Sequence, residues 1–146
     1  MTISIGADRA GFRYKERLAE HLRSQGHRVE DAGTLREEVC DYPVFAEKVA
    51  RTVADRECDF GILICGSGEG MSIAANKIRG IRCGIAYNDE VAALLRQHND
   101  ANVVAFGANF MSYDEVQRKT DIFQSAAFLG TYHADRINMI KAIETK

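Results

Sequence analysis

Short apolar runs alternate with amphipathic segments along the whole chain. The clearest run lies just before Cys65, where Ile62–Ile64 is apolar at odd and even positions alike. Such a run is typical of a strand that is buried on both faces. Shorter runs predict further strands at Ile3–Ile5, around Val29, at Arg82–Tyr87 and at Asn102–Phe106.

Between these runs, apolar residues recur every three or four positions, which is the spacing of one helix face. Tyr14, Leu18 and Leu22 show this spacing after the first strand. Further helices are predicted from Asp41 onward, over Ser72–Ile78, Asp89–His98 and Tyr113–Phe128, and at the end of the chain over Ala134–Glu144. Strands that alternate with helices of about 10–15 residues indicate βαβ units. The pattern therefore predicts an α/β fold, with a doubly wound five-stranded parallel sheet in three αβα layers.

The last predicted helix has no strand after it. Ile137, Ile140 and Ile143 give it an apolar stripe. This extra C-terminal helix is expected either to cover its own sheet or to reach across to a second subunit.

Composition narrows the class of protein. With 146 residues, 46% of them apolar, the chain fits one domain over residues 1–146. Its net charge of −2 gives no basic field, which argues against nucleic acid as a partner. No apolar run approaches the roughly 18 residues of a membrane span. The N-terminus lacks a signal-peptide layout, and the four cysteines form no close pairs. We therefore predict a reduced cytoplasmic protein without a zinc site.

A glycine-rich turn, Gly66-Ser67-Gly68-Glu69-Gly70, follows Cys65 and leads into a helix. Unsatisfied N–H groups and the positive end of the helix dipole make such a turn a ready anion site. Ligands bind at the carboxyl ends of the strands in open α/β sheets, and Cys65 ends its strand. The sequence therefore predicts an active site at this turn.

Polar residues at three other strand ends are expected to converge on the same end of the sheet. They are Asp8-Arg9, Tyr87-Asn88-Asp89 and Gly107-Ala108-Asn109. His98 differs, because it precedes the fifth strand and should lie near the opposite end. Within this pattern, His98 meets Cys65 most easily from a neighbouring subunit.

Familiar phosphate motifs do not fit the turn. Its glycines alternate, whereas a dinucleotide fingerprint needs G-x-G-x-x-G after the first strand, and no G-K-[ST] follows for a P-loop. A cysteine phosphatase would need an arginine to close the loop, where this chain has Met71 and Ser72. The turn therefore predicts an anion-binding site, but it does not identify the reaction.

Longer segments identify a resemblance that runs nearly end to end. They read Gly6-Ala7-Asp8-x-Ala-Gly-Phe12, Asp41-Tyr42-Pro43, Ile64-Cys65-Gly66-Ser67-Gly68-x-Gly70, Ile73-Ala74-Ala75-Asn76-Lys77 and Arg96-Gln97-His98-Asn99-Asp100-Ala101-Asn102. Together they resemble the type B ribose-5-phosphate isomerases, which are grouped with the galactose-6-phosphate isomerase subunits. The resemblance implies a Rossmann-like fold and a homodimer or homotetramer with active sites at the subunit interface. It implies no metal and no organic cofactor.

The implied reaction interconverts an aldose phosphate and its ketose through a cis-enediolate. The resemblance makes Cys65 the base, and a helix N-terminus can lower the pKa of a thiol from about 8.5 towards neutral. Ser67 would steer O1 or O2, and His98 would open the ring by protonating the furanose oxygen. The residues implied to bind substrate are Asp8, Asn99 and the backbone of Gly66, Gly68, Glu69 and Gly70. Asp8 could instead only cap the turn after it, and the Glu69 carboxylate is expected to point away from a phosphate.

The chain departs from the family pattern around the phosphate. Arg9 stands where the family typically has histidine, and Asn109 and Tyr132 stand where arginines tend to clamp the phosphate. Arg136 matches a third such arginine, and His133 also fits the pattern. Since arginine suits a bidentate phosphate grip, we hypothesise that Arg9 partly replaces the missing pair.

Three functions follow from these observations. The first is isomerisation of ribose 5-phosphate and ribulose 5-phosphate. The second is the same chemistry on allose 6-phosphate, galactose 6-phosphate or erythrulose 4-phosphate. The third is a non-catalytic phosphosugar-binding subunit, against which the retention of Cys65, Ser67 and His98 argues.

Overall fold

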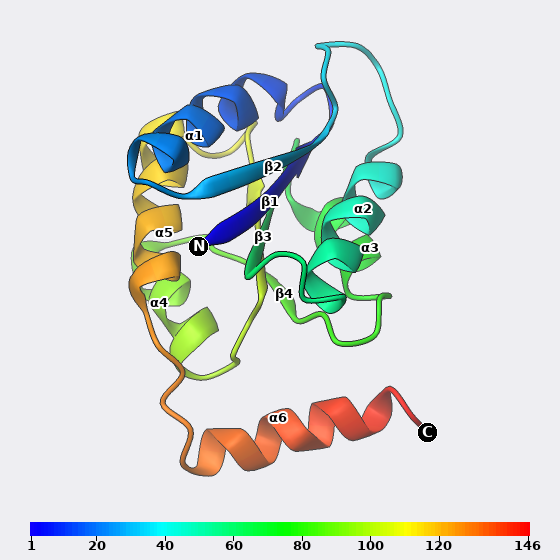
Figure 1. Ribbon diagram of the computed structural model, residues 1–146, viewed down its shortest axis with the longest axis vertical. Helices are drawn as coiled ribbons and strands as arrows, with labels where there is room; N and C mark the ends of the chain where they lie inside the picture. The colour runs from blue at the N-terminus through cyan, green and yellow to red at the C-terminus, as the bar shows by residue number, and fades with distance from the viewer.

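The computed structural model describes all 146 residues and is built on a five-stranded parallel sheet with the strand order β2-β1-β3-β5-β4 (Figure 1). The strands are β1 (Thr2–Ala7), β2 (Arg28–Gly33), β3 (Phe60–Cys65), β4 (Cys83–Ile85) and β5 (Val103–Gly107). All neighbouring pairs are parallel. The predicted Rossmann-like sheet is confirmed.

Helices cover both faces of this sheet. They are α1 (Phe12–Ser24), α2 (Tyr42–Ala54), α3 (Glu69–Ala75), α4 (Asp89–Gln97), α5 (Tyr113–Ser125) and α6 (Tyr132–Ile143). Helices α1, α4 and α5 pack on one face, and α2 and α3 pack on the other (Figure 1). This arrangement gives the three predicted layers. None of the helices is both long and apolar enough to cross a membrane.

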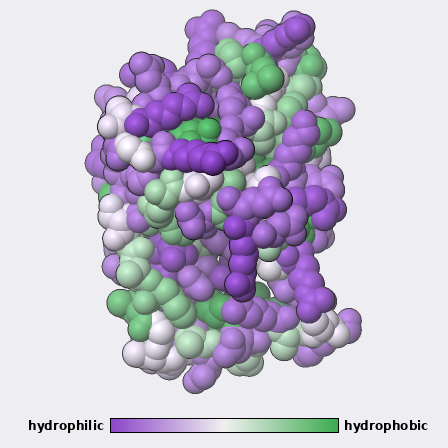
Figure 2. Space-filling model, in the orientation of Figure 1, coloured by the Kyte–Doolittle hydropathy of each residue, from purple (hydrophilic) through white to green (hydrophobic).

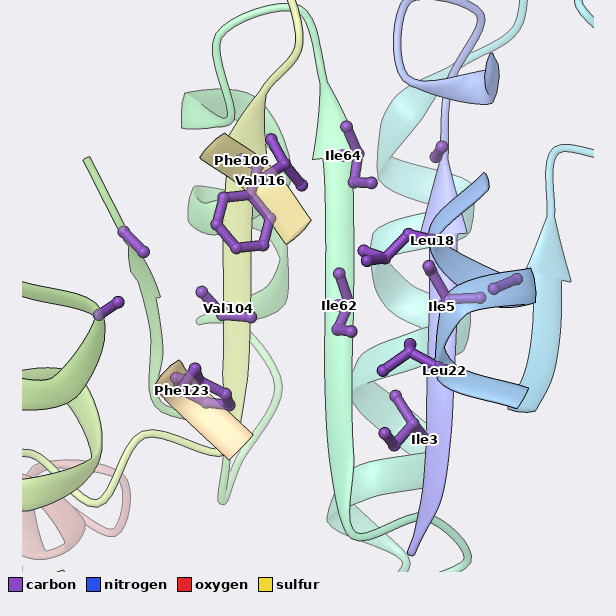
Figure 3. Close-up of a cluster of buried hydrophobic side chains, with 14 of the residues drawn as sticks. Ile3, Ile5, Leu18, Leu22, Ile62, Ile64, Val104, Phe106, Val116 and Phe123 are labelled. Atoms are coloured by element: carbon purple, nitrogen blue, oxygen red, sulfur yellow. The ribbon is translucent and has the colours of Figure 1, made fainter. Parts of the chain in front are cut away.

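The core on the first face is built from alternate residues of the central strands (Figure 3). Ile62 and Ile64 of β3 point to this face, where Leu18 and Leu22 of α1 pack near them. The intervening Leu63 points to the other face, in a second core with residues of α2 and α3. Burial of a side chain of this size contributes about 1.5–3 kcal/mol. Strand β3 is therefore buried on both faces, as its pattern predicted.

Two element boundaries differ from the sequence predictions near the glycine turn. Helix α3 begins at Glu69 and ends at Ala75, three residues earlier at each end than predicted. Strand β4 is shorter than Arg82–Tyr87. Both differences involve Asn76, which follows α3 and exchanges hydrogen bonds of 2.8 and 2.9 Å with the backbone of Cys83. Smaller shifts occur at β2, at the amino end of β5, and at the ends of α5 and α6.

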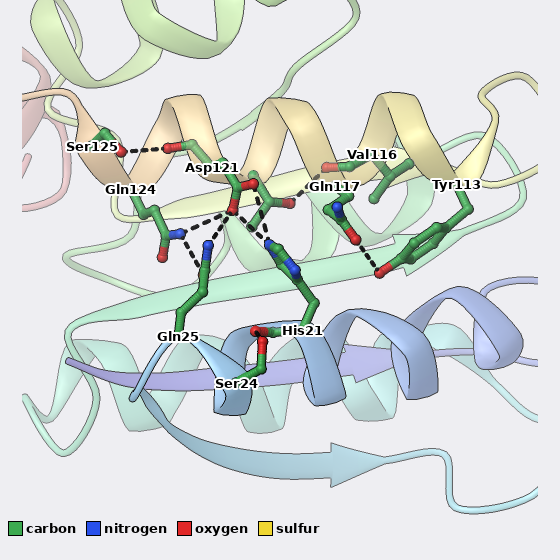
Figure 4. A network of polar contacts seen from close by, with 10 residues as sticks. His21, Ser24, Gln25, Tyr113, Val116, Gln117, Asp121, Gln124 and Ser125 are labelled. Carbon is green, nitrogen blue, oxygen red and sulfur yellow. Dashed lines mark hydrogen bonds and ion pairs between the residues drawn. The ribbon is translucent and has the colours of Figure 1, made fainter.

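A polar network joins α1 to α5 over the first face (Figure 4). The Asp121 carboxylate lies 2.9 and 3.2 Å from Nε2 of His21. The side-chain amides of Gln25 and Gln124 each donate to the same carboxylate at 3.1 Å. The contacts of His21 and Gln25 with Asp121 join residues about a hundred positions apart in the sequence, and they hold the two helices side by side.

Helix α6 lies apart from the layered body, near the end of the sheet at which the strands begin (Figure 1). Ile137 is buried, whereas Ile140 and Ile143 are 42% and 64% exposed. Figure 2 shows hydrophobic surface at the bottom of the molecule, where Figure 1 places α6. The predicted apolar stripe is therefore only partly covered by its own chain.

Candidate active site

The carboxyl ends of β1, β3 and β5 meet at one end of the sheet, called the carboxyl end below. The Asp8 N–H donates to the Ile64 carbonyl at 3.3 Å, and the Asn109 N–H donates to the Gly66 carbonyl at 3.0 Å. A Cβ added at Gly66 would lie 3.0 Å from the Asn109 side-chain nitrogen. The structure thus brings together three of the four strand ends that the sequence placed here, those followed by Asp8, Gly66 and Asn109.

Cys65 is the last residue of β3 and is only 5% exposed. Its sulfur accepts a hydrogen bond of 3.2 Å from the backbone N–H of Gly68. An N–H group directed at sulfur favours negative charge on it. The turn therefore folds back over the sulfur that ends the strand.

This path depends on glycine at two positions. Gly68 has a φ of +83°, and a Cβ there would lie 3.0 Å from the Phe106 carbonyl carbon. A Cβ at Gly107 would lie 2.6 Å from the Ser67 carbonyl oxygen. The turn consequently packs its bare backbone directly on β5, which fixes the direction of its N–H groups.

The two polar side chains of the turn face solvent. Ser67 is exposed, and its hydroxyl accepts a hydrogen bond of 3.3 Å from the Glu69 N–H. The Glu69 carboxylate is exposed and has no hydrogen-bond or ion-pair partner in the chain. The Glu69 carboxylate therefore lies at the surface of the chain, and its direction relative to a bound anion stays a prediction.

Asp8 and Arg9 lie beside the turn, and only the Asp8 side chain is held by a hydrogen bond within the chain. The Asp8 Oδ1 accepts a hydrogen bond of 3.1 Å from the Gly11 N–H, so Asp8 does cap the turn that follows β1. Arg9 is exposed and makes no ion pair. The nearby Arg13, by contrast, pairs with Glu37 at 3.0 Å. Arg9 is therefore an uncommitted cation next to the turn.

Tyr42 also belongs to this site, although the sequence analysis gave it no role. A Cβ added at Gly70 would lie 2.8 Å from the Tyr42 hydroxyl oxygen and 2.5 Å from the ring. The ring therefore lies directly against the turn. The only signal for it in the sequence was the Asp41-Tyr42-Pro43 segment, quoted above for its resemblance.

Two other cysteines are ruled out as bases by their surroundings. Burial raises the pKa of the Cys83 thiol to about 12, although a hydrogen bond with Ser72 lowers it. Burial also raises the pKa of the Cys58 thiol. Both thiols stay protonated near neutral pH. No group of three or more His, Cys, Asp or Glu side chains is arranged to hold a metal ion.

The remaining predicted site residues gather at the opposite, amino end of the sheet. His98 follows α4, and its ring stacks on His133 of α6 with the ring centroids 4.1 Å apart. These two rings, Asn99 and Arg136 line a cavity of about 330 Å³ whose other walls are apolar and which contains no carboxylate. The chemistry of the cavity suits an anion.

Burial and the neighbouring groups shift the pKa of His133. The residue is 6% exposed, and burial, followed by the electrostatic influence of His98 and Arg136, lowers the pKa of its ring. Tyr132, which stands at an expected arginine position, is 61% exposed and lies under the Arg136 guanidinium at 5.0 Å.

A single chain does not bring Cys65 and His98 together. Cys65 pairs with Gly107 at the end of β5, whereas His98 precedes Val103 at its beginning. Because a strand rises about 3.3 Å per residue, roughly 13 Å of sheet separates those two levels. The separation predicted from the order of elements is confirmed.

Comparison with known proteins gives consistent matches over the full chain. A family model described as Ribose/Galactose Isomerase matches residues 3–140. Ribose-5-phosphate isomerase B of Escherichia coli (strain K12) is 43% identical, with 99% of this chain and 97% of that protein covered. Galactose-6-phosphate isomerase subunit LacB of Clostridium acetobutylicum is 35% identical, with 99% and 82% covered.

Solved structures agree with these relatives. Ribose-5-phosphate isomerase B of Clostridium thermocellum superposes with a TM-score of 0.98 at 43% identity, with 99% of this chain and 98% of that one covered. The enzyme of Mycoplasma genitalium, solved with bound ribulose 5-phosphate, gives a TM-score of 0.96 at 37% identity, with 99% and 97% covered.

Proposed function

The chain belongs to the ribose/galactose isomerase family and is an aldose–ketose isomerase of sugar phosphates, and we propose that it interconverts ribose 5-phosphate and ribulose 5-phosphate through a cis-enediolate. The choice of sugar follows relatives of 37–43% identity that carry the name ribose-5-phosphate isomerase B. One observation carries the proposed chemistry. It is the Cys65 sulfur at a strand end, 3.2 Å from the Gly68 N–H.

In the proposed mechanism, the Cys65 thiolate is the base. It removes the proton from C2 of the open-chain aldose, and the electron pair of that bond forms the enediolate while the carbonyl oxygen O1 takes the negative charge. The thiol then returns the proton to C1 while the O2 hydroxyl proton passes to O1, relayed by the Ser67 hydroxyl, which leaves the ketose carbonyl at C2 and a hydroxyl at C1. N–H groups of the turn and the Ser67 hydroxyl stabilise the charged oxygen.

The substrate sugar is cyclic in its main form, so a ring-opening step precedes isomerisation. We assign this step to His98, which gives a proton to the ring oxygen as the bond from that oxygen to C1 breaks, while the C1 hydroxyl releases its proton to solvent and becomes the aldehyde oxygen O1. An imidazole can donate this proton near neutral pH. Asp8 and Asn99 are assigned to the sugar hydroxyls.

A second copy of the chain completes the proposed site. The carboxyl end of one subunit, with Cys65, would face the amino end of its partner, with His98. The separation of these residues within one chain supports this arrangement, as does the exposed apolar surface of Ile140 and Ile143. We propose a homodimer, or a homotetramer built from such dimers.

The phosphate would then lie between cations from both subunits. Arg136 lines the carboxylate-free cavity beside His98, and Arg9 is uncommitted on the facing end. Asn109 and Tyr132 supply no charge. This altered set, together with the LacB relative, supports a second candidate in which the same chemistry acts on a sugar phosphate of another length.

Subunit complementation tests the shared site. Cys65→Ala and His98→Asn variants, each impaired alone, are mixed under conditions that exchange subunits. In a random dimer mixture, half the dimers are hybrids with one intact site each, so about a quarter of the wild-type activity should return. Hybrids that form, as seen by native mass spectrometry, without any gain in rate would contradict a site shared between subunits.

A substrate panel distinguishes the candidate sugars. Isomerisation is measured on aldose phosphates of four, five and six carbons, with Cys65→Ala as the control. The proposal expects the highest kcat/KM on ribose 5-phosphate and its loss in the variant. A Cys65-dependent preference for another length would support the second candidate, and no activity on any sugar would support a binding subunit.

A further inference from the structure

Three rings stack in a row at the amino end of the sheet, and a guanidinium lies beside them. The His98 and His133 rings are nearly parallel, with 14° between their planes and 4.1 Å between their centroids. The Tyr132 ring lies 4.2 Å from the His133 ring, and the Arg136 guanidinium lies 5.0 Å from the Tyr132 ring. The row joins the end of α4 to the first turn of α6.

His133 occupies the middle of this row. Two rings at about 4 Å cannot share one face of an imidazole, so His98 and Tyr132 cover opposite faces of His133. The residue is 6% exposed, whereas Tyr132 is 61% exposed. The His133 ring therefore has little surface left with which to meet a substrate.

The backbone holds the stack from the α6 side. The Leu129 N–H donates to the Gln97 carbonyl at 3.0 Å, next to His98, and the His133 N–H donates to the Gly130 carbonyl at 3.0 Å. These bonds fix where α6 begins relative to the end of α4. The position of the His133 side chain beside His98 therefore follows from the position of the backbone.

Burial and the neighbouring groups lower the pKa of His133, which favours its neutral form. The groups that face the two imidazoles are Tyr132 and Arg136 from α6, Asn99 after α4, and apolar side chains of both helices, with no carboxylate among them. The His133 ring is buried beside Arg136, and its lowered pKa favours the neutral imidazole next to His98. A neutral flat neighbour can support a ring that gains and loses a proton.

We propose that His133 is a positioning residue that holds the plane of the His98 imidazole through the stack, and that it does not bind the substrate itself. This inference rests on the proposed function, in which His98 opens the sugar ring. It revises the sequence-based hypothesis that His133 contacts substrate. The loss of stacking is expected to slow ring opening and to spare proton transfer at Cys65.

The chemistry of the substrate separates the two steps. In ribulose 5-phosphate the C5 oxygen carries the phosphate, so no furanose can form and the ketose is open-chain. Exchange of its C1 hydrogen with deuterium from solvent needs the base but no ring opening. Consumption of ribose 5-phosphate, which is cyclic in its main form, needs both steps.

The experiment compares His133→Ala with His133→Phe, because phenylalanine restores a flat stacking ring without a titratable group. For His133→Ala we expect kcat on ribose 5-phosphate to fall about tenfold or more, with KM and the C1 exchange rate within about twofold of wild type. For His133→Phe we expect kcat to recover to within about threefold. The chain has only four histidines, so the ring-proton signal of His98 can be followed directly by NMR.

His27→Ala is the matched control. It removes a histidine next to β2, the strand farthest from β4 in the sheet, and should change none of these quantities. In the NMR spectrum, the His98 signal should move in His133→Ala and stay close to its wild-type shift in His133→Phe. This readout confirms or contradicts the stacking even if one variant is too unstable for kinetics.

Several results would overturn the inference. An equal loss of kcat in both His133 variants would mean that the imidazole itself is needed, and a rise in KM alone would assign His133 to binding. A parallel fall in C1 exchange would show a disturbance of the whole site. If the wild type shows neither exchange nor isomerisation, the proposed function fails. If it shows both and His133→Ala behaves like it, only the role of His133 fails.

Discussion

The backbone N–H of Gly68 and the sulfur of Cys65 are joined by a hydrogen bond of 3.2 Å that closes the turn after β3. The bond requires Gly68 to hold a φ of +83° and to pack on the backbone of Phe106. The Gly68 N–H can reach the sulfur only because residue 68 has no Cβ. A larger residue at Gly68 should disturb the sulfur before it disturbs the sheet.

Gly68→Ala should lower both stability and activity. The left-handed conformation costs a residue with a Cβ about 1–2 kcal/mol, and the new Cβ would lie 3.0 Å from the Phe106 carbonyl carbon. Gly26→Ala is the control, since Gly26 has a φ of +89° with nothing within 4 Å. Thermal unfolding and initial rates should show a similar conformational loss in both variants and a loss of rate only in Gly68→Ala. Equal rates in the two would contradict the importance of the contact.

Arg9→Ala should raise KM for the phosphorylated substrate. Arg9 has no ion-pair partner and can bind a phosphate, whereas Arg13 is engaged with Glu37. A hydrogen bond to a charged group contributes about 1.5–3 kcal/mol, so KM should rise about tenfold or more with kcat largely kept. Arg13→Ala, which removes the same charge nearby, should leave KM within about twofold of the wild-type value. Equal values of KM in Arg9→Ala and wild type would exclude Arg9 from the phosphate site.

Cys83 should resist alkylation in the folded protein. With a pKa of about 12, only about one Cys83 in ten thousand is a thiolate at pH 8. Mass spectrometry after timed exposure to iodoacetamide should find Cys40, which is half-buried, modified before Cys83 and before the buried Cys58. All four cysteines should react after unfolding. Early modification of Cys83 would contradict its raised pKa.

Glu115→Gln should lower stability at neutral pH and have little effect in acid. The Ser112 N–H donates to the Glu115 carboxylate at 2.8 Å, and this bond lowers the pKa of Glu115 below its ordinary 4.5. The lowered pKa stabilises the fold above about pH 4.5, and the gain is lost as the pH falls through the folded-state value. The Tm difference between wild type and variant should therefore close below that range.

Ser112→Ala separates the two halves of this capping box. The variant loses the hydroxyl cap of α5, worth about 1 kcal/mol, and keeps the backbone bond to Glu115. Its Tm deficit should therefore persist in acid. A deficit of Glu115→Gln that stays constant between neutral pH and pH 3 would contradict the assignment of its lowered pKa to the Ser112 N–H.

The fold was largely predictable because its signals are local. The two-sided apolar run before Cys65 identified the central strand, and the order of elements in a parallel sheet placed His98 at the far end from Cys65. Helix α3 begins earlier than predicted because Gly68 precedes it in a left-handed backbone conformation, and the spacing of apolar residues gives no sign of that conformation. Strand β4 ends at Ile85 because the chain turns there, with the Tyr87 N–H donating back to the Ile85 carbonyl, and the apolar run does not reveal this turn.

The missing parts of the site are contacts between distant residues. Tyr42 lies against Gly70 because glycine leaves room for a ring there, and no spacing in the sequence reveals such a pair. The stack of His98 on His133 depends on how α6 meets α4, and the isoleucine stripe of α6 gave no information about it. Local patterns predict elements, whereas these contacts depend on where the elements finally lie.

The distance between Cys65 and His98 also affects how such a chain can evolve. If two copies complete the site as proposed, a duplicated gene is free to let each product keep only one half of it. One product could retain Cys65 and its turn, while the other retained His98 and Arg136, and the pair would still hold one complete site. A heteromeric descendant would then be recognised by which end of the sheet each of its chains has preserved.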